Sequence, residues 1–265
     1  MSKHKPLILV TGANGQLGKT LQELSLSESA FEWVFCDKKI LDICDPVAIA
    51  AVFAQHKPDY CINTAAYTNV NQAEENPLQA KAVNVTAVDY LVAACNQYNS
   101  CLLHLSTDYV FDGKQSRPYV ESDATHPINV YGKSKAEGEQ IVLTQVQKGY
   151  VIRTAWLYAK SHGHNFYRSI LRKAIAGESL SVINDQVGSP TTTEQLALFL
   201  IQIVKKAPPY GLYHCAGEEV LSWYAFAKKI LQEHQLDVPL VGTITPSGGI
   251  KRPRFSALAT EKRAE

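Results

Sequence analysis

The chain has 265 residues, enough for one large domain or for a cofactor domain with a smaller partner. Its 46% hydrophobic and 19% charged residues are ordinary values for a globular protein. The formal net charge of +1 gives no broad basic surface for nucleic acid, and no apolar stretch approaches the length of a membrane span. We therefore expect neither nucleic acid nor a membrane as a partner.

The six cysteines form no CxxC pair and no histidine-interleaved zinc pattern. The sequence accordingly predicts no metal site and favours a reducing compartment. Near the N-terminus, the apolar run from Leu7 to Val10 is too short for the core of a signal peptide. These observations together predict a cytoplasmic protein.

Short β-rich runs alternate with longer stretches of helical periodicity through the first 155 residues, which predicts βαβ units and a parallel sheet. In chain order we expect a strand at 7–10, a helix at 16–25, a strand at 33–36, a helix at 46–56, a strand at 59–63, a long helix at about 77–98, a strand at 101–106, a helix at about 130–147 and a strand at 150–154. Further helices are expected near 165–176, 193–205 and 222–235, the last with Ser222 as its N-cap.

This pattern predicts an α/β fold, a Rossmann doubly wound parallel sheet with a smaller C-terminal substrate-binding lobe. We assign residues 1–154 to an NAD(P)-binding Rossmann domain. Residues 155–265 are assigned mainly to the substrate-binding lobe, with some segments returning to the Rossmann domain. Loop-like and aromatic stretches after Ala155 favour this division, because substrate contacts usually lie in such regions.

Three glycines with the spacing G-x-x-G-x-x-G, Gly12, Gly15 and Gly18, stand between the first expected strand and the first expected helix. In such a turn one glycine makes the bend, one lets the backbone approach a pyrophosphate, and one lets the helix pack on the sheet. The helix N-terminus then offers N–H groups and the positive end of its dipole to the phosphates. A glycine-rich turn without a ligand has the same bare pattern, but the context favours a dinucleotide site.

Asp37 ends the second strand, about 20 residues beyond the turn, where a carboxylate accepts hydrogen bonds from the adenosine ribose and favours NAD. Lys38 and Lys39 follow it, and an ammonium there neutralises a 2′-phosphate, so NADH and NADPH both stay open. Asp42 and Ile43 are candidates to close over the adenine. A solvated loop residue is the alternative interpretation of Asp42.

Tyr131 and Lys135 are four residues apart, so a helix places them on one face. This pair suits the reduction of a ketone, because a neighbouring cation favours the ionised phenol and is expected to lower the pKa of Tyr131. Tyr224 and Lys228 repeat the spacing, but they lie inside a late amphipathic helix in which we expect Tyr224 to pack against the protein.

The position of Thr107 favours Tyr131 over Tyr224 as the candidate catalytic tyrosine. The strand that ends at Ser106 and Thr107 places a hydroxyl at the carboxyl edge of the sheet, where doubly wound folds bind ligands. Either hydroxyl is a candidate to hydrogen-bond a substrate carbonyl, and capping of a loop is the alternative. Asp108 adds a carboxylate suited to a sugar hydroxyl.

These segments closely resemble the extended short-chain dehydrogenase/reductase superfamily, with the three glycines, Thr107, Tyr131 and Lys135 in the expected order. Within it, the chain is similar to the dTDP-4-dehydrorhamnose reductase family over nearly its whole length. The strings that carry this resemblance are Asn63 to Val70, Ser106 to Gly113, Arg153 to Tyr158, Asp185 to Thr191, and Arg252-Pro253. The resemblance implies NAD(P)H-dependent reduction of the C4 ketone of dTDP-4-dehydro-L-rhamnose to dTDP-L-rhamnose.

The resemblance also implies roles for individual residues. Tyr131 would donate the proton, Lys135 would hold the nicotinamide ribose and tune Tyr131, and Thr107 would position the carbonyl. Asp108 and Trp156 would touch the sugar, and Arg252 would pair with a nucleotide phosphate. The implied cofactor contacts are Gly12, Asn14, Gly15, Gln16 and Leu17 at the pyrophosphate turn, Asp37, Asp42 and Ile43 on the adenosine side, Ala65, Ala66 and Tyr67 at the middle, and Tyr131 and Lys135 at the nicotinamide end.

The chain departs from the family pattern at two places. Asn71 and Gln72 stand where an acidic and a basic residue are common, and the segment from Pro246 to Lys251 looks contracted. These departures leave the exact nucleotide sugar open. A homodimer is also left open, and the magnesium-linked dimer of the family is not carried over because its carboxylates have no match here.

Proteins with two other functions share a similar sequence pattern. One is another nucleotide-sugar reductase or epimerase, and the other is a non-catalytic NADP-binding regulatory subunit. Tyr109, directly after Asp108, counts against a dehydratase, which usually has Thr-Asp-Glu at this point. The joint presence of Thr107, Tyr131 and Lys135 favours an enzyme over a regulatory subunit.

Overall fold

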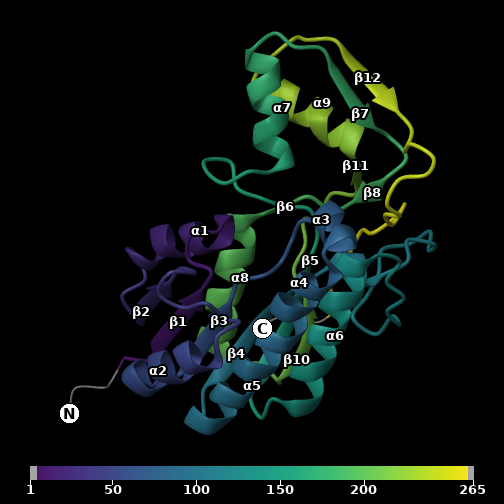
Figure 1. The fold of residues 1–265 in the computed structure, drawn as a ribbon. Coiled ribbons are helices and arrows are strands. Elements are labelled where there is room, and N and C mark those ends of the chain that lie inside the picture. Colours follow the sequence, from purple (N-terminus) through teal and green to yellow (C-terminus); the bar gives the residue numbers. More distant parts are fainter. Residues whose placement is uncertain (1–4, 262–265) are drawn as a thin grey trace.

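The centre of the computed structural model, which describes residues 5–261, is a six-stranded parallel sheet in the order β10-β5-β4-β3-β1-β2 (Figure 1). Its strands are β1 (Leu7–Thr11), β2 (Glu32–Cys36), β3 (Tyr60–Asn63), β4 (Cys101–Thr107), β5 (Gly149–Thr154) and β10 (Gly211–His214). The strand order reverses between β1 and β3, and such a switch point opens a crevice at the carboxyl ends of the strands. The predicted doubly wound fold is confirmed.

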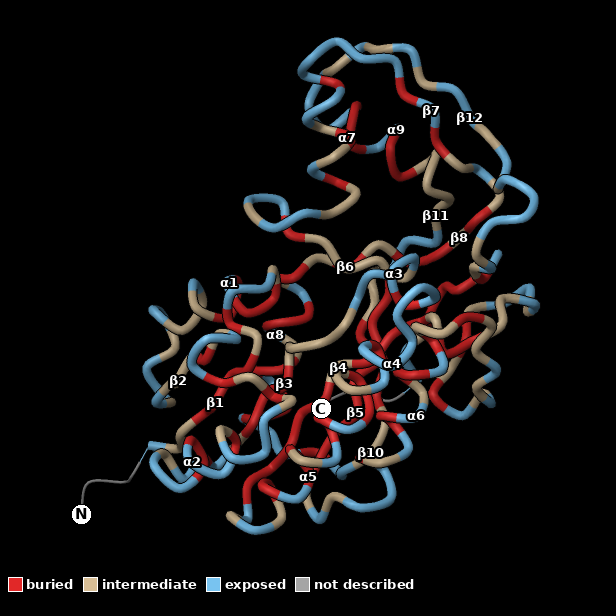
Figure 2. Tube along the Cα trace, in the orientation of Figure 1, coloured by how far each residue is buried: buried red, intermediate tan, exposed pale blue. Residues whose placement is uncertain are grey.

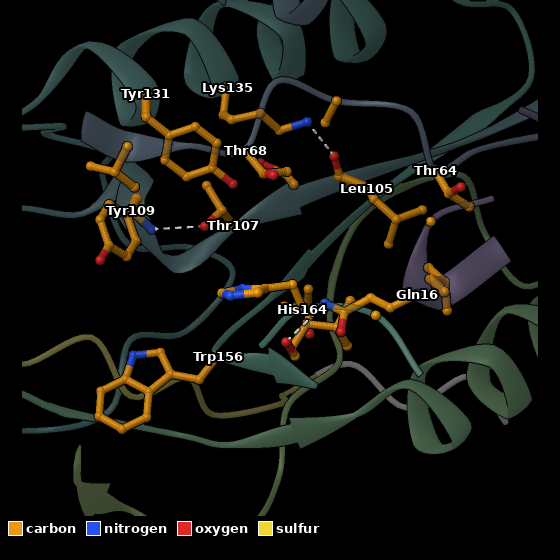
Figure 3. A pocket seen from close by; sticks show the side chains of 18 of the residues that line it. Gln16, Thr64, Thr68, Leu105, Thr107, Tyr109, Tyr131, Lys135, Trp156 and His164 are labelled. Carbon is orange, nitrogen blue, oxygen red and sulfur yellow. Dashed lines mark hydrogen bonds between the residues drawn. The ribbon is translucent and has the colours of Figure 1, made fainter. Parts of the chain in front are cut away.

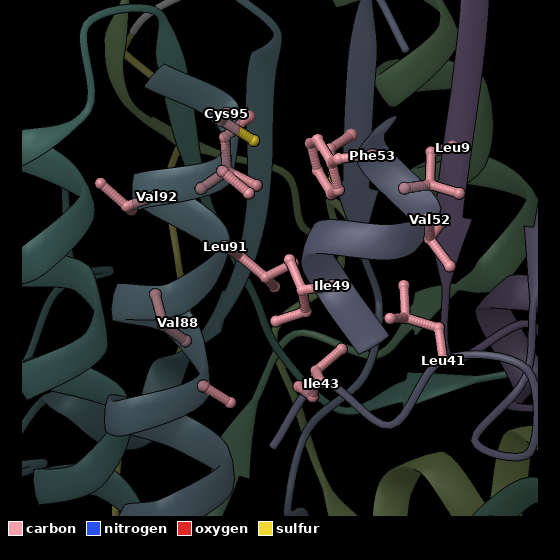
Figure 4. Close-up of a cluster of buried hydrophobic side chains, with 14 of the residues drawn as sticks. Leu9, Leu41, Ile43, Ile49, Val52, Phe53, Val88, Leu91, Val92 and Cys95 are labelled. Carbon is pink, nitrogen blue, oxygen red and sulfur yellow. The ribbon is translucent and has the colours of Figure 1, made fainter. Parts of the chain in front are cut away.

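Helices cover both faces of this sheet. One face carries α1 (Gln16–Ser25) and α8 (Thr193–Lys206), and the other carries α2 (Pro46–His56), α5 (Ala87–Tyr98) and α6 (Val130–Gln145). Successive side chains of β1 point to opposite faces, so Ile8 packs in the first apolar cluster and Leu9 in the second. The second cluster is shown in Figure 4, and Figure 2 shows that the central strands of the sheet are largely buried, whereas the edge strand β2 is only partly buried. Because both faces of the sheet are covered, the strands are continuously apolar and do not alternate with polar residues, as is typical of a parallel sheet.

Polar side chains define the starts of several helices. Asp45 accepts hydrogen bonds from two backbone N–H groups at the start of α2, and Pro46 occupies the first turn. Asn129 caps α6 by accepting from the N–H of Gly132 at 2.7 Å. Ser222 caps α9 (Trp223–Glu233), as predicted. These caps are local in sequence, which explains why the sequence predicted the helix starts closely.

A smaller lobe lies beyond the carboxyl edge of the sheet (Figure 1). It is built from α7 (Phe166–Ile175), α9 and the parallel pair β7 (Leu180–Ile183) and β12 (Leu240–Thr243) around a shared apolar cluster. Two short pairs join it to the sheet, β6 (Leu157–Tyr158) with β9 (Thr191–Thr192) and β8 (Val187–Gly188) with β11 (Leu221–Ser222). Between these segments the chain returns to the large sheet through α8 and β10. The division at residue 154 itself stays a prediction.

The helix expected at about 77–98 is interrupted. It consists of α4 (Pro77–Lys81), a π-helical turn η1 (Ala82–Thr86) and α5. Asn84, inside the turn, accepts from the backbone N–H of Tyr67 at 2.9 Å and donates to Ser134 of α6 at 3.0 Å. Tertiary hydrogen bonds of this kind are not encoded in a local pattern. The sequence also did not predict α3 (Val70–Glu75), the 3-10 turn η2 (Asp108–Val110), β7, β10 or β12.

A buried ion pair fixes α6 against the sheet. Arg153 of β5 donates to both carboxylate oxygens of Glu139 of α6, at 2.8 and 2.7 Å, and each side chain is 4% exposed. The guanidinium also lies over the ring of Phe111, 5.0 Å from its centre. Because neither ion has water to replace its partner, separating them leaves an uncompensated charge in the interior.

Replacing Glu139 with glutamine should therefore destabilise the protein strongly. We expect Glu139→Gln to lower the free energy of unfolding by about 3–5 kcal/mol in urea titrations, because it leaves the Arg153 charge buried without a counter-ion. The control is Glu28→Gln, which breaks the more exposed pair of Glu28 with Lys205 and should cost less than about 1 kcal/mol. Equal losses in the two variants would contradict the role given to the buried pair.

Candidate active site

A cavity of about 580 Å³ lies at the carboxyl edge of the sheet (Figure 3). Its wall is formed by the glycine-rich turn and the start of α1, the ends of β4 and β5, the first turns of α6, and residues of the smaller lobe. The lining includes Gln16, Thr107, Tyr131, Lys135, Trp156 and Trp223. The three predicted catalytic residues are thus brought together in one cavity.

A second cavity of about 350 Å³ adjoins the first along the glycine-rich turn, with Asn14, Gly15, Thr64 and Ala66 lining both. The predicted cofactor residues are distributed over the two. Gly12, Asp42, Ile43, Ala65 and Tyr67 line the second cavity, and Gln16, Leu17, Tyr131 and Lys135 line the first. Together the cavities form an elongated site along the edge of the sheet.

The site fits a dinucleotide. Gly12 has φ +63°, and a Cβ built on it would lie 2.8 Å from the backbone nitrogen of Ala65, so the turn requires glycine. Gly15 precedes α1 without a side-chain cap, which leaves the helix N-terminus available to phosphate. At the other end, the buried hydroxyls of Ser106 and Thr154 line the first cavity without a hydrogen-bond partner among the described residues. Unsatisfied groups of this kind suit a polar ligand.

Asp37 follows β2 as predicted, but it lines neither cavity. One carboxylate oxygen accepts from the Asn14 amide at 2.8 Å, and the other accepts from the backbone N–H groups of Lys39 and Ile40. Lys38, by contrast, lines the second cavity, with a highly exposed ammonium 3.7 Å from Asp42. The carboxylate therefore orders the turn, and the lysine faces the ligand space.

Thr107 is oriented by a buried network. Its hydroxyl donates to Asp108 at 3.1 Å, and Asp108 accepts from Ser256 at 2.5 Å. Asp108 is 2% exposed and is not among the residues that line the first cavity, and it lies behind Thr107. Burial raises the pKa of Asp108 to about 7, against the lowering effect of the Ser256 and Thr107 hydrogen bonds.

The surroundings of Tyr131 reverse one expectation. Desolvation raises the pKa of the phenol above its ordinary value, and contact with the Thr107 hydroxyl offsets this only in part. The sequence predicted a lower pKa from the neighbouring lysine, but Lys135 points its ammonium at the backbone oxygen of Leu105, 2.6 Å away (Figure 3). The effect of lost hydration on the Tyr131 pKa is thus larger than the effect expected from Lys135. Tyr131 therefore remains protonated, as a proton donor must be.

An aromatic pair forms the wall on the side of the smaller lobe. Trp156 adopts a left-handed conformation, φ +47°, and stacks on Trp223 with ring centres 3.4 Å apart and an angle of 2° between the planes. A Cβ on Gly188 would lie 2.4 Å from the Trp156 indole, so glycine is needed there to seat the ring. Flat aromatic walls of this kind suit the faces of sugars and bases.

Arg252 lies at the rim and not in the same cavity as Tyr131. It donates to Asn71 at 2.8 Å and to the Tyr109 hydroxyl at 3.4 Å, and Tyr109 packs edge-on against the Tyr131 ring. Arg252 lines a neighbouring hollow of about 700 Å³ with Arg254 and the segment 245–251. Asn71, one of the departures from the family pattern, therefore serves as an acceptor for the arginine.

Gln16 connects the glycine-rich turn with the segment 157–165 that leads into the smaller lobe. Its amide nitrogen donates to the backbone oxygen of Leu157 at 3.0 Å, and its amide oxygen accepts from Asn165 at 3.1 Å and from the N–H of Ala159 at 3.3 Å. Gln16 thus connects the start of α1 with the entrance of the lobe, and His162 adds a second contact, 2.9 Å from the Gln16 backbone oxygen.

Sequence reasoning missed part of the lining. Thr154 had a usable signal, because it ends β5 beside Thr107, and the carboxyl ends of neighbouring parallel strands meet at one edge. Trp223 and His164 had none, since the fold of the smaller lobe brings them to the cavity from distant parts of the chain. Tyr224, of the second Tyr-x-x-x-Lys, packs in the apolar cluster of that lobe.

This fold, together with Thr107, Tyr131 and Lys135 at the edge of a parallel sheet, is that of the extended short-chain dehydrogenase/reductase superfamily. Within it, a family model described as the RmlD substrate binding domain matches residues 6–265, and the chain belongs to this family. The resemblance recognised from the sequence is confirmed.

Curated and solved relatives agree with this assignment. The chain is 42% identical to the dTDP-4-dehydrorhamnose reductase of Aggregatibacter actinomycetemcomitans, over 96% of this chain and 91% of that protein. It is 38% identical to a dTDP-4-keto-6-deoxy-D-glucose reductase of Streptomyces niveus, over 94% and 87%. The crystal structure of Bacillus anthracis dTDP-4-dehydrorhamnose reductase in complex with NADP matches with a TM-score of 0.93 and 36% identity, covering 97% and 92% of the two chains.

Within residues 5–261 there is no helix with the length and apolar character needed to cross a membrane.

Asp108 should give the protein a specific pH dependence of stability. Its pKa is raised from 3.8 to about 7 in the folded state, so its stabilising contribution is complete below about pH 4 and is lost as the pH rises to about 7. Asp108→Asn does not titrate. We expect the unfolding free energy of the variant minus that of the wild type to grow by more than about 1.4 kcal/mol between pH 4.5 and 7.5, as measured in urea. A difference that is independent of pH would contradict the raised pKa.

Proposed function

We propose that this protein reduces the C4 ketone of dTDP-4-dehydro-L-rhamnose to dTDP-L-rhamnose, with NADPH as its reductant. The observation that carries the proposal is the meeting of Thr107, Tyr131 and Lys135 in a cavity that also reaches the glycine-rich turn. The relatives support the substrate, since proteins at 42% and 36% identity bear the name of this reductase. The alternatives, an epimerase or a regulatory subunit, are not favoured.

A reduced nicotinamide dinucleotide bound along the two cavities supplies the hydride. The turn at Gly15, together with Gln16 and Leu17, is suited to hold its pyrophosphate, and Lys135 to hold the ribose nearest the reacting ring. Asp42 and Ile43, in the wall of the second cavity, would hold its adenosine end. At the opposite end, Ser106 and Thr154 offer hydroxyls that have no hydrogen-bond partner within residues 5–261.

Tyr131 is placed to donate the proton. When hydride reaches C4, negative charge develops on the ketone oxygen, and the phenol transfers its proton to that oxygen to give the alcohol. Thr107 lies beside it, and its hydroxyl, which donates to Asp108 in the free site, would turn its single proton to the same ketone oxygen and orient it. The stacked pair of Trp156 and Trp223 is proposed to bound the sugar, and Arg252 to bind a phosphate of the nucleotide at the rim.

Cytoplasmic residence and a homodimer belong to the same proposal as predictions. All six cysteines are free and mostly buried, which supports a reducing compartment. A dimer would sediment at twice the chain mass of 29.2 kDa in analytical ultracentrifugation, whereas a monomer would sediment at that mass.

The activity is tested by following the loss of NADPH absorbance with enzymatically generated dTDP-4-dehydro-L-rhamnose, and in parallel with dTDP-4-keto-6-deoxy-D-glucose. Turnover of the first ketone, identified as dTDP-L-rhamnose by its NMR spectrum, supports the proposal. Turnover of the second ketone alone would move the assignment to the other reductase activity, and tight cofactor binding without turnover of either would refute both.

Tyr131→Phe should retain cofactor binding and reduce kcat at least ~100-fold, because it removes the hydroxyl that donates the proton while preserving the ring. Tyr224→Phe is the matched control, since it makes the same change in the second Tyr-x-x-x-Lys, and we expect activity within about twofold of wild type. Steady-state kinetics and fluorescence titration of NADPH separate the two effects. Near-normal turnover by Tyr131→Phe would exclude it as the donor.

Lys38 should select NADPH over NADH. Because its ammonium faces the adenosine end of the second cavity, we expect Lys38→Ala to raise KM for NADPH by about tenfold, the effect of one charge-assisted hydrogen bond, with little change for NADH. Lys39→Ala, the neighbouring lysine outside that lining, is the control and should leave the ratio unchanged. Equal increases for both dinucleotides in Lys38→Ala would argue against recognition of a 2′-phosphate there.

A further inference from the structure

His164 is a side chain of the first cavity to which no step of the proposed reaction gives a role. It lies on the segment between β6 and α7 and reaches the cavity from the side of the smaller lobe (Figure 3). The side chain is exposed, and it makes no hydrogen bond, ion pair or ring contact with any other of residues 5–261. Its imidazole is therefore free to bind a ligand.

The backbone on both sides of His164 is held against the start of α1. Gly163 has φ +76°, and a Cβ built on it would lie 2.9 Å from Cβ of Gln16, so this close approach requires glycine. Asn165 donates to the side-chain oxygen of Gln16 at 3.1 Å and caps α7 by accepting from the N–H of Arg168 at 3.0 Å. The fold thus holds His164 beside the glycine-rich turn, although no contact of its own side chain keeps it there.

The side chains that can carry positive charge are spread along the length of the site. Among the residues that line the two cavities, they are Lys38, His164 and Lys135. Lys38 is proposed at the adenosine end, and Lys135 at the nicotinamide ribose. The pyrophosphate between these ends carries two negative charges, and the turn proposed to bind it, from Asn14 to Leu17, has N–H groups but no cationic side chain. His164, beside this turn, can supply that charge.

We propose that His164 binds the pyrophosphate of the dinucleotide as an imidazolium, from the side of the smaller lobe, while the N–H groups of the glycine-rich turn bind it from the start of α1. An imidazolium has two N–H donors and no acceptor, so it meets phosphate oxygens through charge-assisted hydrogen bonds. The inference deepens the proposed function, because it adds a cofactor contact from the lobe that bounds the sugar. It concerns the dinucleotide alone and does not depend on which ketone is reduced.

The nucleotide sugar also contains a diphosphate, but the contacts favour the dinucleotide. Both chain neighbours of His164 lie against Gln16, which belongs to the turn proposed to hold the pyrophosphate. Arg252, which is proposed to bind a phosphate of the nucleotide sugar, lies at the rim and is not among the residues that line the first cavity. The two diphosphates are therefore expected at different places, and separate titrations distinguish them.

The test measures dissociation constants by isothermal titration calorimetry without any ketone, at about pH 6, where histidine side chains ordinarily carry charge. NADP⁺ and NAD⁺ both contain the pyrophosphate, and adenosine 2′-monophosphate lacks it. We expect His164→Gln, which keeps a polar side chain but removes the charge, to raise Kd for both dinucleotides about fivefold, the scale of one charge-assisted hydrogen bond. Binding of adenosine 2′-monophosphate should be unchanged.

Three further variants separate this contact from others. Lys38→Ala should weaken NADP⁺ and adenosine 2′-monophosphate but not NAD⁺, because Lys38 is proposed to pair with the 2′-phosphate. His164→Arg restores the charge, and we expect its Kd for both dinucleotides to stay within about twofold of the wild type. His126→Gln is the matched control and should change nothing, since it makes the same substitution at an exposed histidine outside both cavity linings.

Unchanged Kd values for NADP⁺ and NAD⁺ in His164→Gln would overturn the proposal. A rise in Kd for dTDP without one for the dinucleotides would also overturn it, because the contact would then belong to the nucleotide sugar. An equal loss of adenosine 2′-monophosphate binding would count against it too, since the substitution would then have disturbed the whole site. No ketone is reduced in these titrations, so their result is independent of the reductase assay.

Discussion

The buried ion pair between Arg153 and Glu139 is the interaction on which the geometry of the site depends. It joins β5 to the middle of α6, so the helix cannot slide along the sheet without separating two desolvated ions. Tyr131 and Lys135 precede Glu139 on that helix, and their positions relative to the strand ends are set by the same contact. Since β4 is hydrogen-bonded to β5 in register, Thr107 is placed by the same rigid unit.

Much of the larger unit was predictable because its signals are local. The cap at Asp45, the glycines of the first turn and the apolar strands each occupy a few consecutive residues, and a parallel sheet follows from their alternation with helices. The π-helical turn around Asn84 and the pairing of β7 with β12 depend on partners far away in sequence. No local pattern contains those partners, so the smaller lobe was predicted least well.

The same distinction holds within the site. Thr107, Tyr131 and Lys135 were predictable from strand order and helical spacing, since both rules place residues before any side chain is built. The pKa of Tyr131 was predicted in the wrong direction, because the sequence shows which residues are neighbours but not how much water reaches the phenol. Asp108 illustrates a related limit, because the sequence did not show that its carboxylate would be buried and would accept from both Thr107 and Ser256.

Gln16 has a consequence for how the two ligand spaces respond to each other. One side chain at the start of α1 bonds the backbone at Leu157 and Ala159, directly after Trp156. His162, whose Nε2 lies 2.9 Å from the backbone oxygen of Gln16, joins the same two segments. A displacement of the start of α1 would therefore strain contacts at the entrance of the smaller lobe, and any coupling of the two ligand spaces through these contacts is reciprocal.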